Sequence, residues 1–487
     1  MNTPLRRAAW VCLVLFGLLL VNANWVQVVK AGHYRNQPGN LRILLAEYSN
    51  QRGAIVARNK EELAVSEVTN DRFKYLRKYV AGPLYAHATG YYSLVYGPSA
   101  IERAENAILS GADDRFFVNR MVDLITGEEK RGGNVVLTLD PRVQQAAAEA
   151  LGNRKGAVVA LNPSTGAILA MVSSPSYNPN DLSSHNPAAI HRTWEQLTAD
   201  PDKPLLNRVL NETYPPGSIF KMVTAAAALA TGSYTKDSRV SCPATLPLPQ
   251  STRSLPNASG RAYGGSDGIT LEEALQVSCN TAFGALGIEL GGNELRQQAE
   301  KFGVNDNMAV PMKTATSVFP TDIDEAQSAL SAIGQFDVRL TPLQAAMIAA
   351  GVANRGEVMR PYLVAEIQAP DLSTLERAKP QVLSRAISPD VADQLTAMMT
   401  TVVEQGTGQR ARISGVTVAG KTGTAEGRKD AKPHAWFISF APAEDPQVAV
   451  AVIVEGGAAN RDDISGGKIA APIAKAAIQA ALWAPER

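Results

Sequence analysis

Apolar stretches separated by polar turn signals run along the chain, and the first of them predicts a membrane-spanning helix. Residues 8–29 contain no charged side chain, and a bilayer needs about 20 residues of helix. Arg6 and Arg7 precede this stretch and favour a cytoplasmic N-terminus, so the rest of the chain would face outward. Asn22 and Asn24 make its far end less apolar. Val21-Asn22-Ala23 resembles a cleavage site, so a cleaved signal peptide is the alternative to a retained anchor at residues 1–30.

The next region, residues 31–152, is richer in charged and aromatic residues, and it predicts a separate, smaller domain. Short strand-like pieces at 53–56 and 134–139 alternate with turns. Near the end of the region, Asp140 followed by Pro141 is typical of a helix start. We find no constellation of catalytic side chains in this region.

A shift in composition predicts a larger domain over residues 153–487. Two β-rich runs, 156–161 and 167–172, flank a polar turn and predict a hairpin. Residues 173–204 are dense in Ser, Asn, Asp and Pro, which predicts mostly loop.

Capping signals predict the helices that follow, and apolar runs predict the closing strands. Thr270 and Glu273 form a capping box ahead of a helix that reaches about residue 290. Further helices are predicted from Thr341-Pro342, from Ser388-Pro389 and at 472–483, with strands from 416 into Lys421, at 434–440 and at 447–454. Strands at both ends with helices between them predict an α+β fold, in which helices cover one antiparallel sheet.

The strongest candidate for chemistry is Ser218, which follows Pro215-Pro216-Gly217 at the head of an apolar, alanine-rich helix. The two prolines keep the helix from beginning earlier, and Gly232 offers it a stop. A serine needs a base to take its proton, and Lys221 would lie beside it because positions i and i+3 share a helix face. Free backbone N–H groups at the helix start could bind an oxyanion.

Two further segments distinguish this serine from chance Ser-x-x-Lys matches at Ser233–Lys236 and Ser465–Lys468. Ser278-Cys279-Asn280 lies inside the helix predicted after Thr270, where both polar side chains could simply bond to backbone. With the other motifs present, we expect a break near Cys279 that turns them into a cleft. Lys421-Thr422-Gly423-Thr424 is the third motif, and it occurs once.

The overall composition excludes several classes of function. With 45% hydrophobic and 19% charged residues the chain is globular, and a net charge of +1 gives no electrostatic case for nucleic acid as a partner. No Cys or His cluster has metal-ligand spacing, and the chain has no His-Glu-x-x-His. Cys242 and Cys279 could form a disulfide in an exported chain, but two free buried thiols fit the sequence equally well.

The three motifs, in this order, resemble those of class B penicillin-binding proteins, most closely the actinobacterial penicillin-binding protein A type. The similarity extends over nearly the whole chain. It includes Gln51-Arg52-Gly53, Leu206-Asn207-Arg208, Ile333-Gly334-Gln335, Leu340-Thr341-Pro342 and the continuation of the third motif to Glu426. It implies a transpeptidase domain with a sheet between helix layers, a non-catalytic pedestal domain and a membrane anchor, without a cofactor.

The resemblance also implies roles for individual residues. Ser218 would be acylated and Lys221 would take its proton, while Ser278 would pass a proton to the leaving D-alanine. Asn280 would hold the substrate amide and orient Lys221. Lys421 would supply a positive charge, Thr422 and Thr424 would bind the substrate carboxylate, and Gly423 would allow close approach of the substrate. The backbone N–H groups of Ser218 and Thr424 would form the oxyanion hole, whereas Glu426 and His434 are expected to be structural.

The implied function is a peptidoglycan D,D-transpeptidase, which acts on stem peptides and is acylated by β-lactams. The alternatives are a D,D-carboxypeptidase, a serine β-lactamase, and a membrane-anchored β-lactam sensor or division scaffold. The resemblance also implies the cytoplasmic membrane, a lipid II-polymerising glycosyltransferase and divisome proteins as partners. The catalytic domain would lie on the outer side of the cell membrane.

Overall fold

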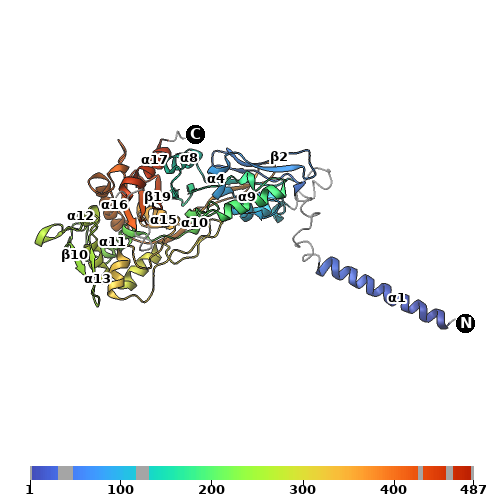
Figure 1. Ribbon diagram of the computed structural model, residues 1–487, viewed down its shortest axis with the longest axis horizontal. Coiled ribbons are helices and arrows are strands. Elements are labelled where there is room, and N and C mark those ends of the chain that lie inside the picture. The colour runs from blue at the N-terminus through green and yellow to red at the C-terminus, as the bar shows by residue number, and fades with distance from the viewer. Residues whose placement is uncertain (1–2, 31–47, 117–130, 426–431, 457–463, 484–487) are drawn as a thin grey trace.

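The computed structural model describes residues 3–30, 48–116, 131–425, 432–456 and 464–483. The N-terminal helix α1 (Thr3–Asn24) continues into a short π-helix (Trp25–Val29), and none of the residues of α1 is buried. Figure 1 shows this helix projecting from the rest of the molecule. By length and composition, the helical stretch Thr3–Val28 can cross a membrane. It is a candidate anchor, as predicted.

A six-stranded sheet forms the domain next to α1, which we call the pedestal. The strand order is β15-β14-β6-β1-β2-β3. The strands are β1 (Ile55–Val56), β2 (Glu62–Val68), β3 (Tyr75–Tyr79), β6 (Asn134–Leu137), β14 (Val364–Gln368) and β15 (Thr374–Arg377). Strands β14 and β15 come from late in the chain, and β14 pairs antiparallel with β6. The pedestal is therefore joined to the larger domain by its own sheet.

A buried ion network holds the pedestal helices to this sheet. Glu102 lies in helix α5 (Ala100–Ala104) and is fully buried. Its carboxylate accepts from Nε of Arg52 and from Nε of Arg77, both at 2.6 Å. The charge of the two guanidinium groups holds the pKa of Glu102 below its ordinary value despite burial.

We expect Glu102→Gln to destabilise the protein by about 3–5 kcal/mol, because two buried guanidinium groups would lose their counter-charge. Urea unfolding followed by circular dichroism measures this. Glu67→Gln is the matched control, since Glu67 pairs with Lys78 on an exposed strand surface, where a pair contributes at most about 1 kcal/mol. Equal effects of the two substitutions would contradict the expectation.

The larger domain is built on a five-stranded antiparallel sheet with the order β17-β18-β19-β7-β8. The strands are β7 (Gly156–Leu161), β8 (Ile168–Ser174), β17 (Ala419–Ala425), β18 (His434–Ala441) and β19 (Val448–Val454). The hairpin predicted from residue 156 is confirmed, as is the antiparallel pairing of the last strands. The strand predicted from residue 416 into Lys421 is β17, and it begins later, at Ala419. Strand β17, which carries the Lys421 motif, lies at an edge.

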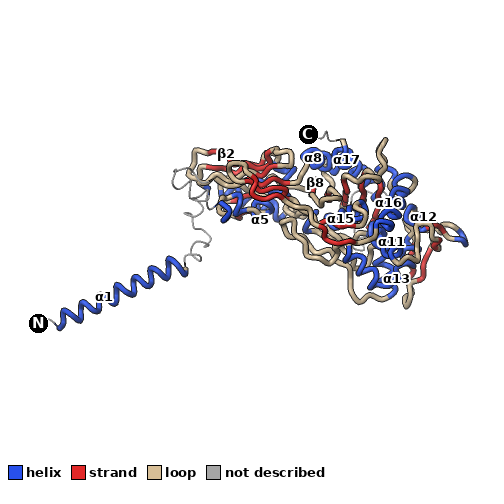
Figure 2. Tube along the Cα trace, turned by 180° about the vertical axis from the view of Figure 1, so that it is seen from behind, coloured by secondary structure: helices blue, strands red, loops and turns tan. Residues whose placement is uncertain are grey.

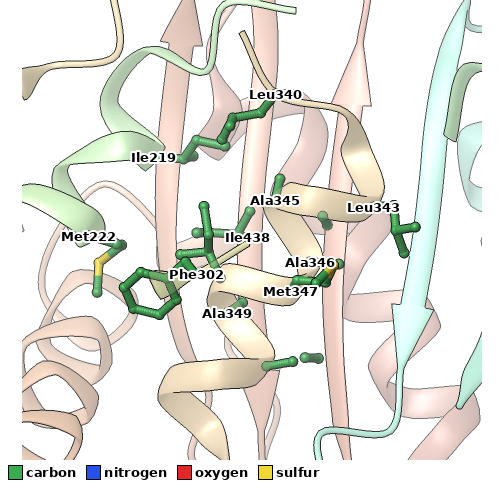
Figure 3. Packing of buried hydrophobic residues seen from close by; sticks show 14 of the residues in the cluster. Ile219, Met222, Phe302, Leu340, Leu343, Ala345, Ala346, Met347, Ala349 and Ile438 are labelled. Carbon is green, nitrogen blue, oxygen red and sulfur yellow. The ribbon is translucent and has the colours of Figure 1, made fainter. Parts of the chain in front are cut away.

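Helices cover both faces of this sheet. Successive side chains of a strand point to opposite faces, so these apolar strands present a hydrophobic surface on each side. Ala157, Val159 and Leu161 of β7 face one core, which contains α11 (Lys221–Ala230) and α15 (Pro342–Ala353). Figure 3 shows Ala345 and Ala349 of α15 on the same face as Ile438 of β18. Val158 and Ala160 face the other core, against α8 (Pro141–Leu151) and α17 (Ala471–Leu482). The predicted α+β sandwich is confirmed.

Most predicted helix starts are confirmed by their caps. The side chains of Asp140, Thr270, Thr341 and Ser388 each accept from a backbone N–H of the helix that follows. The other helices are α4 (Gly82–Thr89), α6 (Asn106–Leu109), α10 (Arg208–Asn211), α12 (Leu271–Gln276), α13 (Asn280–Lys301), α14 (Glu325–Ala332) and α16 (Pro389–Glu404). Short two-stranded pairs are β4 (Tyr92–Ser93) with β5 (Gly97–Pro98), β9 (Arg239–Val240) with β12 (Ile269–Thr270), β10 (Thr245–Pro247) with β11 (Ser254–Pro256), and β13 (Glu357–Met359) with β16 (Val382–Arg385).

The prediction that residues 173–204 are mostly loop is wrong. They include α9 (Pro187–Ala199), whose N-cap Asn186 accepts from two backbone N–H groups of the first turn. Ile190 and Trp194 of this helix pack with Tyr177 and Tyr91 in a satellite cluster. Figures 1 and 2 show that the helices around α11 lie at the far end of the molecule from α1.

Candidate active site

Ser218 lies in a tight turn that leads into a buried helix. Residues Gly217–Phe220 form one 3₁₀ turn, and α11 continues from Lys221. In a 3₁₀ turn, side chains three residues apart are eclipsed, so Ser218 and Lys221 point the same way. Gly217 has φ +55°, which favours glycine, and the Ser218 side chain is half-buried. The predicted helix start is therefore confirmed, with a first turn tighter than an α-helix.

Contacts from two other segments fix this turn. The N–H of Gly217 donates to the carbonyl of Gly334 at 2.9 Å, and a Cβ at Gly334 would lie 2.2 Å from the carbonyl oxygen of Gly217. The indole N–H of Trp436 on β18 donates to the carbonyl of Pro215 at 3.0 Å. The Trp436 contact could not be predicted, since a tryptophan in an apolar strand is typical of an ordinary core residue.

Lys221 is fully buried and bonds to the second motif. Its amine donates to the carbonyl of Ser278 and to Oδ1 of Asn280, each at 2.8 Å, and to Oγ of Ser278 at 3.2 Å. Burial lowers the pKa of Lys221 well below its ordinary value, and the nearby charge of Lys421 lowers it further. No hydrogen bond joins Ser218 to this amine among the described residues. The arrangement provides a buried amine, one turn from a serine, that can be neutral near physiological pH.

Ser278 and Asn280 lie at the break expected near Cys279. Helix α12 ends at Gln276, α13 begins at Asn280, and Ser278 between them has φ +59°. This left-handed backbone is uncommon for serine and aims both polar side chains at Lys221. The hydroxyl of Ser278 also accepts from the amine of Lys421 at 3.0 Å. One hydroxyl thus lies between two lysine amines.

Lys421 approaches from the edge strand β17 and is also fully buried. Its amine donates to the carbonyl of Thr422 at 2.8 Å as well as to Ser278. Burial lowers the pKa of Lys421 to about 7. The positive charge of Lys421 disfavours the charged form of Lys221, in addition to the effect of burial.

The rest of the third motif lies against the Ser218 turn. A Cβ at Gly423 would meet Ile219 and the carbonyl of Pro216 at 3.0 Å, so any larger residue would require the turn or the strand to shift. Thr424 is exposed, and its carbonyl oxygen lies 2.8 Å from where a Cβ on Gly217 would be. The hydroxyl of Thr422 shares a 2.6 Å hydrogen bond with Thr407, a residue that the sequence reasoning missed.

The remaining candidates lie elsewhere or outside the described residues. Ser233 and Lys468 are exposed, and the hydroxyl of Ser465 caps a short helix by accepting from the N–H of Lys468. His434 is half-buried with its ring against that of Tyr214 at 5.5 Å, in agreement with a structural role. Glu426 lies outside the described residues. Within the described part of the chain, no group of three His, Cys or acidic side chains could hold a metal ion.

Cys242 and Cys279 form a disulfide, with Cα atoms 6.4 Å apart. The sequence left this pairing open. The disulfide joins Cys279, the middle residue of the second motif, to the segment before β10.

The chain is similar to known proteins over its whole length. The family model for the penicillin binding protein transpeptidase domain matches residues 156–479, and that for the penicillin binding protein A dimerisation domain matches residues 52–135. Peptidoglycan D,D-transpeptidase PbpA of Mycolicibacterium smegmatis is 50% identical, and that of Mycobacterium tuberculosis is 48% identical, each over 99% of both chains. The penicillin G acyl-enzyme complex of M. tuberculosis penicillin-binding protein A has a TM-score of 0.85 at 48% identity, covering 89% of this chain and 100% of that one.

Proposed function

The chain belongs to the penicillin-binding protein family, and we propose that it is a peptidoglycan D,D-transpeptidase whose acyl-enzyme forms on Ser218. The observation that carries the residue assignment is the cluster of Lys221, Ser278 and Lys421, one helical turn from Ser218. A lysine that is neutral near physiological pH can act as a base, and a serine beside it can act as a nucleophile.

In the acylation step, Oγ of Ser218 attacks the carbonyl carbon between the two D-alanines of a stem peptide, or the β-lactam carbonyl. Lys221 takes the hydroxyl proton as the new C–O bond forms. Lys421 remains charged, which keeps the pKa of Lys221 low before the step. The backbone N–H groups of Ser218 and Thr424 stabilise the oxyanion, and such a donor typically contributes about 3 kcal/mol.

The substrate lies along β17, with its terminal carboxylate near Lys421 and the hydroxyls of Thr422 and Thr424. Gly423 lets β17 lie close against the Ser218 turn, which keeps the strand edge beside the nucleophile for the substrate backbone. Asn280 donates to or accepts from the substrate amide while its Oδ1 orients Lys221. This arrangement favours a peptide that ends in a carboxylate.

Breakdown of the tetrahedral intermediate breaks the C–N bond and releases D-alanine. Its amine receives a proton through Ser278, whose hydroxyl accepts from both lysine amines and can therefore direct its own proton into the cleft. The amine of a second stem peptide then attacks the ester. A new amide bond forms, and Ser218 regains its proton.

The helix over Thr3–Val28 anchors the enzyme in the cell membrane, with the catalytic domain on the outer side. Arg6 and Arg7, at the N-terminal end of this helix and ahead of its uncharged stretch, support this orientation. The pedestal separates the site from the membrane. A lipid II-polymerising glycosyltransferase and divisome proteins are partners in this proposal, on the basis of the resemblance described above.

Product analysis tests the transpeptidase assignment. We expect a stem-peptide donor ending in D-alanyl-D-alanine, mixed with an amine acceptor, to yield the cross-linked amide together with free D-alanine. Chromatography with mass spectrometry measures both products. Free D-alanine without the amide would indicate a D,D-carboxypeptidase, rapid turnover of penicillin would indicate a β-lactamase, and no product from an enzyme that penicillin labels would support a sensor or scaffold.

A further inference from the structure

We propose that Asn257 is a positioning residue for the reaction, because it holds the second motif in the conformation that orients Lys221. This inference rests on the function proposed above. Asn257 lies directly after β11 and is 4% exposed. None of the three motifs contains it, and it belongs to a segment more than twenty residues earlier in the chain than Asn280.

The side-chain oxygen of Asn257 caps helix α13 from outside that helix. It accepts from the backbone N–H of Asn280 at 2.9 Å and from that of Thr281 at 3.2 Å. The first N–H groups of a helix have no partner within the helix, and a side-chain oxygen placed there satisfies them. Asn257 thereby fixes the backbone at the residue whose side chain bonds to Lys221.

The side-chain nitrogen of Asn257 holds the Asn257 side chain in place by bonding to nearby backbone carbonyls. It donates to the carbonyl of Pro243 at 2.9 Å and to that of Arg261 at 2.8 Å. The neighbouring carbonyl of Pro256 accepts from the amide of Asn280 at 3.0 Å. That bond leaves Oδ1 of Asn280 directed at Lys221, since an amide nitrogen held by a carbonyl fixes which end of the side chain faces the lysine.

All three acceptors of Lys221, which come from Ser278 and Asn280, thus depend on this one asparagine. The carbonyl and hydroxyl of Ser278 lie two residues before the capped N–H of Asn280, in a left-handed backbone that favours glycine. Such a conformation persists only where surrounding contacts hold it. We infer that Asn257 supplies those contacts and that its loss would let Ser278 and Asn280 move away from Lys221.

The loss would be visible in both the rate and the pH dependence of acylation. Hydrogen-bond acceptors stabilise the charged form of Lys221, so losing them lowers its pKa. Lys421 is the charged group that acts on Lys221, and its place on β17 does not depend on Asn257, although its bond to Ser278 would be lost as well. Since the lysine must be neutral to act as base, the acid limb of the pH profile would move to lower pH, and the plateau would fall because the amine is no longer oriented.

The test compares Asn257→Ala, Asn257→Asp and Asn180→Ala in the full chain. Long incubation with labelled penicillin gives the competent fraction, and the second-order acylation rate is then measured per competent molecule from pH 5 to 9. We expect Asn257→Ala to lose about ten- to a hundredfold in rate, with the acid limb at lower pH. Asn257→Asp keeps an oxygen that caps the helix and should recover most of that rate, although it also loses stability.

Asn180→Ala is the matched control. Asn180 likewise accepts from and donates to the backbone of a distant segment, at Tyr79 of the pedestal. We expect a lower melting temperature but an unchanged rate and pH profile. If Asn257→Ala leaves no competent fraction, Asn257→Ser replaces it, since its shorter side chain cannot reach both N–H groups.

Two outcomes would overturn the inference. In the first, Asn257→Ala is less stable, but its rate per competent molecule and the acid limb of its pH profile stay at their wild-type values. The other is an equal loss of rate in the alanine and aspartate variants. Failure of the proposed function would look different, because the wild-type protein would then carry no penicillin adduct on Ser218.

Discussion

Ser218→Ala is expected to abolish covalent labelling by penicillin completely. The alanine side chain has no atom that can form the ester, and no other described serine combines a half-buried hydroxyl with a buried lysine three residues later. Mass spectrometry of the intact protein after penicillin treatment measures the adduct, and peptide mapping locates it. The wild-type protein should gain one adduct, on the peptide that contains Ser218.

Ser233→Ala and Ser465→Ala are the controls, and both should be labelled like the wild type. Lys236, the partner of Ser233 by spacing, bonds to Asp237, which raises its pKa and keeps it charged. Ser465 uses its hydroxyl as a helix cap. An adduct that survives Ser218→Ala would end the assignment of the nucleophile.

Local signals were enough to predict the elements that carry the chemistry. Thr270 and Glu273 were expected to form a capping box, and both of its bonds are present. The break near Cys279, by contrast, was expected only because the other two motifs were present. A cap depends on residues within a few positions of each other, so a sequence contains most of the information that determines it.

Contacts between distant segments could not be predicted in the same way. No motif marks residues 364–377, yet β14 and β15 complete a sheet whose other members precede residue 138. Thr407 and Asn257 lie in turns that show no motif, and their roles depend on which distant groups they meet. Helix α9 was missed because its start is set by Asn186 and Pro187, which also suit a loop.

Lys221→Arg is expected to lower the acylation rate by about 10²- to 10⁴-fold, the usual contribution of a general base. Arginine stays charged in proteins and cannot accept the proton of Ser218. The rate is measured with a fluorescent penicillin across pH. In the wild type it should fall as the pH drops, because Lys221 becomes protonated, whereas the variant should remain slow at every pH.

Lys421→Arg is the control for Lys221→Arg. It distinguishes the loss of the base from the crowding that a larger side chain causes. Both lysines are fully buried, so both replacements force a guanidinium group into the same crowded region. In the proposed mechanism Lys421 contributes only positive charge, and an arginine retains that charge. We therefore expect Lys421→Arg to lose much less activity than Lys221→Arg. Near-normal acylation in Lys221→Arg would remove Lys221 from its role as base, and equal losses in the two variants would attribute the effect to packing.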